Sequence, residues 1–519
     1  MKKFFLACIL LFPLITVSGQ GKADKPLRIE IPAKADDESH RILAMGDKGV
    51  VLFFKSIEKQ NDSLVKWYFS FYDKNLKHKW LKSVAIPANM EFFKSLFVGD
   101  KGSFCFVKAG KEKGTTAGIL VLGLDPESGE FLAKRAGIPE KSDPAGFYVT
   151  AGKAFFAYNT KNDVPAIKII ELSTGKISGF EWSNNVPSLL TGFMVDTLSA
   201  TILGYLKKFY TKNKYEYFIS YLDFSGKPKG EVLVNDKNAS GSGDTYILDI
   251  NTVRLSNGDL GAYGAYRTGS IKNQDKNNLV LPATGIYYLR ISGGQVVSSR
   301  FTNFLTFGHT ALPGKSEIES FEKKAGKKNK DINEFSLDYS VIVHPVDYVN
   351  NEMLLLADLF TPQFHMENYT NFDYYGRPST NSYRVFDGYR FINGIVIGMN
   401  GSGDILWKNG IELVNLVSFN LEPKVNFSIA SDSTMLLSYL SQGKVGYKVI
   451  DHDKVIEKLD FSSLEMLSAE DKLLNESKSN MIPWYDNNFL CYGYQEIKNI
   501  NASENRKRIV FFLTKISSD

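Results

Sequence analysis

The sequence has few of the residues that build metal and redox sites. Among 519 residues there are three cysteines and six histidines, and the histidines are scattered along the chain. We find no H-E-x-x-H pair, G-x-S-x-G elbow, P-loop or Cys–His signature. The segment Asp236–Gly241 imitates the first half of a calcium loop, but Ile247 stands where a bidentate glutamate is required. We therefore predict no catalytic residue, no metal ligand and no cofactor.

Long apolar runs are also missing, except at the N-terminus. Lys2 and Lys3 precede the run FFLACILLFPLITV, and small residues precede Gln20. This pattern is typical of a secretory signal peptide, and the run is too short to span a bilayer comfortably. We expect residues 1–19 to be cleaved and the chain from 20 to 519 to be exported, with no transmembrane segment.

The remaining cysteines, Cys105 and Cys491, lie in the alternating apolar runs SFCFV and FLCYGY. One interpretation is a disulfide, which an oxidising compartment permits. The other, which the positions of the two residues favour, is a pair of small core side chains. The net charge of +5 is too mild to indicate a nucleic-acid partner.

The abundant residues are those of strands and turns. The chain has 26 tyrosines, 37 phenylalanines and 42 glycines, which suits pleated, half-buried strands joined by tight turns. One phrase recurs: an apolar strand, a polar turn and a second strand, as in EYFISYLDFSGKPKGEV. Its turns begin at Asp73, Asp125, Ser173, Asp223, Ser292, Asn400 and Asp451.

The phrase repeats at intervals of about fifty residues, the period of a propeller blade. Two further strands precede each copy, so each unit has four antiparallel strands, A to D. We predict an all-β fold, a single β-propeller over residues 20–519, with eight blades and seven as the alternative. The last unit lacks a fourth strand, and residues 26–32 supply a spare one that would close the ring and cover its open edge.

With these blades, the chain resembles the exported β-propeller proteins of Bacteroidetes-like cell envelopes, whose degenerate blades have the form YxxxLDxxG. The resemblance covers the mature chain and implies an architecture, not an activity. The chain ends in a core strand, so no sorting domain is apparent. We therefore expect the protein in the periplasm or on the periplasmic side of the outer membrane.

Strand alternation places the B–C and D–A connections on one face of a propeller. We call it the loop-rich face, because its B–C loops are long and basic. They carry Lys55, Lys59, Lys108, Lys111, Lys113, Lys207, Lys208, Lys212, Lys214, Lys272 and Lys276. One interpretation is ordinary solvated loops; the other is a cationic surface for an acidic protein, lipid head group or polysaccharide.

Two insertions fall on the loop-rich face. The first, residues 306–336, is basic, and its Ser316–Glu319 capping box predicts a short helix. The second, residues 361–391, is predicted as an aromatic B–C loop. Tyrosine and arginine are common interface anchors, so we expect partner-binding residues at Phe364, Tyr369, Phe372, Tyr374, Tyr375, Arg377, Tyr383, Arg384, Tyr389 and Arg390. The alternative is that these rings cap the channel.

Two functions remain. The first is a non-catalytic binding protein that docks a protein partner through its loop-rich face; one form is an accessory or plugging subunit of an outer-membrane assembly such as the type IX secretion translocon. That form rests on the resemblance alone. The second is a propeller hydrolase or lyase acting on a glycan or peptide. It requires ionisable residues on neighbouring A strands, and RILAMG, FKSLFVG and FMVDTL show no consistent set.

Overall fold

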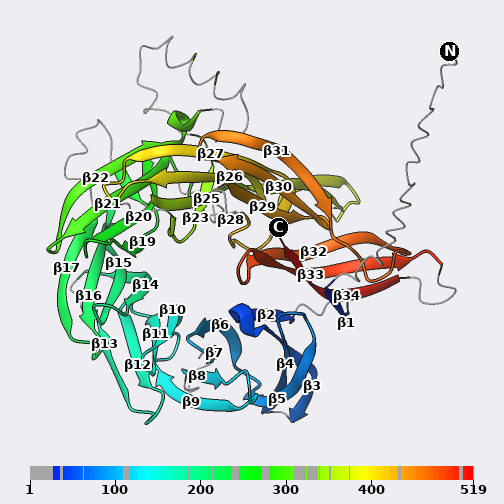
Figure 1. Cartoon of the computed structure of the whole chain (residues 1–519), viewed down its shortest axis with the longest axis horizontal. Coiled ribbons are helices and arrows are strands. Elements are labelled where there is room, and N and C mark those ends of the chain that lie inside the picture. The colour runs from blue at the N-terminus through cyan, green and yellow to red at the C-terminus, as the bar shows by residue number, and fades with distance from the viewer. Residues whose placement is uncertain are drawn as a thin grey trace, which may run out of the picture.

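The computed structural model is an all-β ring of eight sheets. It describes residues 27–34, 39–61, 63–108, 117–183, 186–211, 214–234, 245–269, 280–308, 339–349, 352–372, 374–429, 434–501 and 507–517, with the single positions 312, 319, 323 and 337. Figure 1 shows the sheets following one another around the ring in chain order, each with its first strand toward the centre. The β-propeller prediction and the preferred count of eight blades are confirmed.

The first four blades are runs of four consecutive antiparallel strands. Blades 1 and 2 contain β2 (Arg41–Ala44), β3 (Val50–Asn61), β4 (Leu64–Tyr72), β5 (His78–Pro87), β6 (Glu91–Val98), β7 (Lys101–Lys108), β8 (Ala117–Leu124) and β9 (Phe131–Ile138). Blades 3 and 4 contain β10 (Asp143–Thr150), β11 (Lys153–Asn159), β12 (Pro165–Glu171), β13 (Ile177–Glu181), β14 (Ser188–Asp196), β15 (Thr201–Thr211), β16 (Lys214–Asp223) and β17 (Pro228–Val234).

In blades 5 and 6 the inner strand is split into two short pieces. The strands are β18 (Thr245–Ile247), β19 (Asn251–Arg254), β20 (Leu260–Thr268), β21 (Gly285–Ser292) and β22 (Gln295–Asn303), then β23 (Ser340–Val343), β24 (Asp347–Val349), β25 (Glu352–Phe372), β26 (Pro378–Met399) and β27 (Ile405–Ser418). Blade 7 holds β28 (Asn426–Ile429), β29 (Met435–Ser441), β30 (Lys444–Asp451) and β31 (Lys454–Ser463). Two short 3-10 helices, η1 (Gly46–Lys48) and η2 (Phe304–Phe307), lie in connections.

Blade 8 joins the two ends of the chain. Its strands are β32 (Asp471–Pro483), β33 (Asn488–Asn499), β34 (Lys507–Ser517) and β1 (Arg28–Pro32). β1 pairs antiparallel with β34, with Arg28 opposite Thr514 and Pro32 opposite Val510, and Figure 1 shows the two side by side. The predicted N-terminal closure is confirmed, and it covers the edge of β34 that would otherwise be open to another chain.

The recurring phrase is the hairpin between the third and fourth strands of a blade. In blade 4 the Asp223 carboxylate accepts hydrogen bonds from the backbone N–H groups of Ser225 and Lys227, at 2.8 and 2.9 Å. Hydrogen bonds from Ser225 and from the backbone lower the pKa of Asp223 to about 2. Asn400 makes the same two contacts in blade 6 through its amide oxygen. The turn therefore needs a short side chain with an acceptor oxygen, not a charge.

The core is divided among the interfaces between neighbouring blades. The second and third strands are buried on both faces, because each blade is stacked between two others; β7 and β8 are examples. The fourth strands form the rim and are mostly exposed, as in β31. Cys105 and Cys491 are both free and buried, in blades 2 and 8, which confirms the interpretation as core side chains. The described part of the chain contains no helix long and apolar enough to cross a membrane.

The two predicted insertions fare differently. The first, residues 306–336, joins β22 to β23, and its capping box lies almost wholly outside the described residues. The predicted calcium-like segment at 236–241 is also outside them. The second, expected as a loop, is instead the outer half of the hairpin formed by β25 and β26, with pairing that runs out to Phe372 opposite Pro378. The backbone groups of this segment are therefore satisfied by regular pairing.

Candidate functional site

Two adjoining cavities open where the link between β27 and β28 approaches the inner strands of blades 1, 2 and 8. The larger, the mouth cavity, has a volume of about 590 Å³. It is lined by His40, Arg41, Ile42, Phe53, Phe92, Ser95, Tyr389, Phe419, Asn420, Leu421, Glu422, Lys478, Tyr492, Tyr494 and Phe511. The smaller, the side cavity, has about 410 Å³ and shares Phe419, Asn420 and Lys478 with it. A D–A link lines both, so both lie on the loop-rich face.

Two strained residues mark these cavities. Of the ten non-glycine residues with positive φ in the described chain, eight lie in turns, whereas Asn415 and Lys478 lie inside β27 and β32. Their φ angles are 54° and 50°. Each sits where the pairing register shifts, so each belongs to a β-bulge. Both line the side cavity. Bulges and left-handed residues within strands concentrate at functional sites, where they re-aim side chains.

An arginine and an aromatic ring form one wall of the mouth cavity. The guanidinium carbon of Arg41 lies 5.3 Å from the centre of the Phe92 ring. No carboxylate among the described residues forms an ion pair with Arg41. The mouth cavity is also lined by an acidic residue, Glu422, whose carboxylate accepts a hydrogen bond from Asn480 at 3.4 Å. Burial, and then the charge of Glu422, raise the pKa of Tyr492 to about 12, so its hydroxyl stays neutral and able to donate a hydrogen bond.

His40 is held rigidly at the back of this wall. Its ring is stacked between Phe54 and Phe511, with centroid distances of 4.6 and 5.1 Å. The His40 backbone N–H donates to the Tyr494 hydroxyl at 3.0 Å, and the same hydroxyl lies 3.2 Å from Nδ1. His40 is only 7% exposed. The ring thus joins blades 1 and 8 at the edge of the cavity, as a packing residue fixed by its neighbours.

The link that divides the two cavities is anchored by a buried carboxylate. The Oδ2 atom of Asp358, on β25, accepts hydrogen bonds from the backbone N–H groups of Lys424 and Val425 at 2.6 and 3.4 Å. His344 Nε2 lies 3.1 Å from the same oxygen. Asp358 is fully buried. This anchor holds the link at residues 424 and 425, directly after the residues 419–422 that line the mouth cavity.

Beside the cavities, the β25–β26 hairpin continues beyond the blade as a two-stranded ribbon. We call residues 361–390 the arm. Its predicted partner residues are mostly exposed: 45% for Tyr369, 69% for Phe372, 97% for Tyr374, 79% for Tyr375 and 46% for Tyr383. Arg377, Arg384 and Arg390 are exposed as well, and Phe364 is half-buried. Tyr389, in contrast, is 6% exposed and lines the mouth cavity at the base of the arm.

Pairing gives the arm two different surfaces. One carries Phe364 and Phe386, whose ring centres are 5.4 Å apart, with the Arg384 guanidinium 4.1 Å from the Phe364 ring. The other carries His365, Glu367, Tyr369 and Tyr383, joined by hydrogen bonds and ring contacts.

His365, which the sequence did not single out, also contacts Asp387 at 2.6 Å. Hydrogen bonds to Asp387 and Glu367 raise the pKa of its imidazole. A partner would thus meet an apolar, cationic surface on one side of the arm and a polar, aromatic one on the other.

The basic B–C loops are only partly described. The side chains of Lys59, Lys111, Lys113, Lys212, Lys272 and Lys276 lie outside the described part of the chain. Lys207 lies over the Tyr215 ring at 3.7 Å, and burial lowers its pKa to about 8. Lys208 pairs with Glu231 at 2.6 Å. These two lysines are engaged within blade 4, and so contribute less to a cationic surface than their sequence suggests.

No protein-family model and no curated protein matches this chain. Solved structures similar to it are propeller proteins. The β-propeller domain of the trilobed protease from Pyrococcus furiosus is 8% identical, over 83% of this chain and 99% of that one, with a TM-score of 0.34. The WD40 domain of SCAP from fission yeast is 10% identical, over 94% and 98%, with a TM-score of 0.37.

A puromycin-hydrolyzing peptidase of Mycobacterium tuberculosis is 9% identical, over 81% of this chain and 53% of that one, with a TM-score of 0.40. The chain thus spans about half the length of this peptidase. Identities this low bear on the fold alone and carry no statement about activity.

Proposed function

We propose that the protein is a non-catalytic β-propeller that binds a protein partner through the arm on its loop-rich face. The observation that carries this proposal is the arm itself: a paired ribbon that projects from blade 6 with large aromatic side chains exposed on both of its surfaces. An isolated two-stranded hairpin is marginally stable in water. Exposed apolar patches with polar rims are typical of interaction sites.

The composition of the arm suits a protein partner. Tyrosine and arginine dominate the energetic centres of protein interfaces, and both recur along the arm, with Arg384 already stacked on Phe364. The free edges of a two-stranded ribbon also offer backbone donors and acceptors to a strand from another chain. We infer that a partner covers the arm by side-chain contact, edge pairing or both.

The finer form of the proposal places the protein in the cell envelope. The signal-like N-terminus supports export, to the periplasm or the periplasmic side of the outer membrane. Within that compartment we propose an accessory or plugging subunit of an outer-membrane assembly such as the type IX secretion translocon. The support for that form is the resemblance of the blades to exported envelope propellers.

The test is a gentle detergent pull-down from envelope fractions. The intact protein is compared with a variant in which residues 363–388 are replaced by Asn-Gly, a dipeptide that closes a two-residue hairpin. We expect a stoichiometric partner to be lost with the arm. A matched variant, Lys74→Gln, changes an exposed residue in a C–D turn on the opposite face and keeps the partner. Retention of the same partner by the armless variant would contradict the proposal.

One observation favours the alternative, a propeller hydrolase or lyase acting on a glycan or peptide. The mouth cavity holds ionisable groups, Arg41, Glu422 and Lys478, beside the Tyr492 hydroxyl. This alternative requires turnover of a glycan or peptide by the purified protein. The Tyr492→Phe variant, which removes only the hydroxyl, would then lose turnover while keeping the fold.

A further inference from the structure

The mouth and side cavities make a second, separate site beside the arm. Their volumes, about 590 and 410 Å³, are each in the range that holds a small molecule or a sugar residue. They share one wall, formed by Phe419, Asn420 and Lys478. The arm serves neither cavity except through Tyr389 at its base. A ligand of two or three linked rings could therefore occupy both cavities without touching the outer part of the arm.

The site offers two cationic side chains to an anion, Arg41 and Lys478. Arg41 faces the mouth cavity with no carboxylate partner among the described residues, and its orientation is fixed by Phe92 at 5.3 Å. An arginine held in this way presents a planar fork that matches a carboxylate. Lys478 lies at the boundary of the two cavities, on a bulge that holds its backbone at a φ of 50°. Strained backbone of this kind is typical of functional sites, and here it directs the lysine at the boundary of the two cavities.

The remaining groups select a body that is rich in hydroxyls and has apolar ring faces. Aromatic rings line the mouth cavity, and Phe419 is 66% exposed at the wall that the cavities share. Glu422 borders the mouth cavity. Glu476 borders the side cavity, and its Oε2 atom accepts a hydrogen bond from Gln495 at 2.7 Å.

The Glu422 carboxylate can accept hydrogen bonds from ring hydroxyl groups, which a simple aromatic acid lacks.

We propose that the two cavities bind a short acidic oligosaccharide, a chain of sugar rings that carry carboxylates. One carboxylate lies against Arg41 and Lys478, a ring face packs on Phe419, and ring hydroxyls donate to Glu422. The proposal concerns binding only and requires no turnover. It also stands apart from the arm, since none of these residues belongs to residues 361–390.

The experiment measures binding of trigalacturonic acid to the full-length mature protein by isothermal titration calorimetry. The comparison ligands are maltotriose, a neutral trisaccharide, and benzoate, an aromatic acid without hydroxyls. We expect both to bind at least about tenfold more weakly than trigalacturonic acid. Equal affinity for maltotriose would overturn the role of Arg41 and Lys478, and equal affinity for benzoate would overturn the sugar assignment.

Variants locate the site. Arg41→Gln keeps hydrogen-bonding atoms and removes the charge, and Lys478→Gly removes the charge at a position whose backbone suits glycine. We expect each to weaken binding about tenfold. Lys74→Gln, on the opposite face, keeps wild-type affinity. Thermal unfolding confirms that all three are folded.

Wild-type affinity in both cavity variants, or no heat of binding at millimolar ligand, would overturn the proposal. The armless variant separates the two proposals, because it should bind trigalacturonic acid normally.

Discussion

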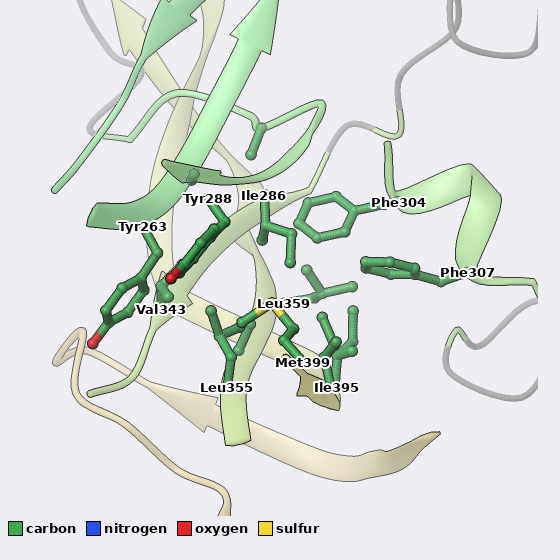
Figure 2. Packing of buried hydrophobic residues seen from close by; sticks show 14 of the residues in the cluster. Tyr263, Ile286, Tyr288, Phe304, Phe307, Val343, Leu355, Leu359, Ile395 and Met399 are labelled. Carbon is green, nitrogen blue, oxygen red and sulfur yellow. The ribbon is translucent and has the colours of Figure 1, made fainter. Parts of the chain in front are cut away.

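The interfaces between blades 5 and 6 and between blades 7 and 8 perform the same task with different chemistry. The first is apolar: nineteen buried hydrophobic residues of the described chain pack together there, and Figure 2 shows Phe304, Leu355 and Met399 filling the space between the sheets. The second has a cluster of only seven such residues. A crevice of about 750 Å³ opens beside it.

Beside this thin core, blade 8 contains a buried polar network that includes the closing strand β1. Arg28 of the closing strand lies 4.8 Å from the ring centre of Phe512, a member of that cluster. Its guanidinium donates to Glu30 at 2.8 Å and to Gln495 at 2.7 Å. Glu30 in turn accepts from Arg508, which also binds Asp471. All of these residues belong to blade 8, so side-chain hydrogen bonds hold β1 there in addition to its backbone pairing with β34, and together they fix its register.

The largest effect is expected at this network. Arg28→Met keeps much of the side-chain volume but removes the buried donor to Gln495 and one of the two arginine donors to Glu30. The side chains of Arg28 and Glu30 are 0% and 7% exposed, and breaking such a pair costs about 3–5 kcal/mol. Urea unfolding should show that loss in the free energy of unfolding. The control is Arg300→Met, which breaks the half-exposed pair with Asp404 and should cost no more than about 1 kcal/mol. Equal, small losses of unfolding free energy in the two variants would show that the network does not stabilise the closed ring.

The next largest effect is a difference in stability between truncations in the two apolar clusters. Leu355, fully buried between blades 5 and 6, should lose about 2–5 kcal/mol on truncation to alanine, because a dry cavity remains. Leu464 is 6% exposed and borders the crevice between blades 7 and 8. Its truncation enlarges a space that is already open, so we expect a loss smaller by about 1–2 kcal/mol. The same unfolding measurement compares the two, and equal losses would mean that the crevice is closed in solution.

Acid should weaken the polar network of blade 8 more than the apolar interface between blades 5 and 6. The hydrogen bond from Arg508 lowers the pKa of Asp471, whose side chain is 1% exposed. A folded-state pKa below the unfolded value of about 3.9 stabilises the protein above that pH, and this contribution is lost as the pH falls through the folded-state pKa. Asp471→Asn should therefore be less stable at neutral pH and show a flatter decline between neutral pH and about pH 3. An unchanged pH dependence would contradict the assignment.

The sequence predicted the fold because each blade repeats one local signal. Residues such as Asp223 and Asn400 close the same hairpin through backbone hydrogen bonds, so a turn could be read without knowing its neighbours. The missing strand of the last blade could be deduced because an open edge is unfavourable. The arm was expected as a loop, since alternation of apolar and polar residues is absent where both surfaces of a ribbon are exposed.

The cavities could not be predicted from the sequence. Arg41, Glu422 and Lys478 come from three different blades or links, and only ring closure brings them together. The inner strands are mainly apolar in sequence, and Arg41, the first residue of β2, carries no signal that it lines a cavity. Lys478 and Asn415 occupy bulges, and a bulge leaves no sequence signal when its residue is not glycine. None of the polar residues that line the site therefore belongs to a recognisable sequence motif.

The smallest effect is expected at the arm, where the same residue type has a different role. Phe304 between blades 5 and 6 is fully buried, whereas Phe372 on the arm is 69% exposed. Phe372→Ser should therefore change the free energy of unfolding by less than about 0.5 kcal/mol, while Phe304→Ala should cost about 3–5 kcal/mol. If Phe372→Ser is strongly destabilising, the arm packs on the propeller in solution and caps the channel. If it is neutral, the exposed ring has no role in folding, as the proposed partner-binding role of the arm requires.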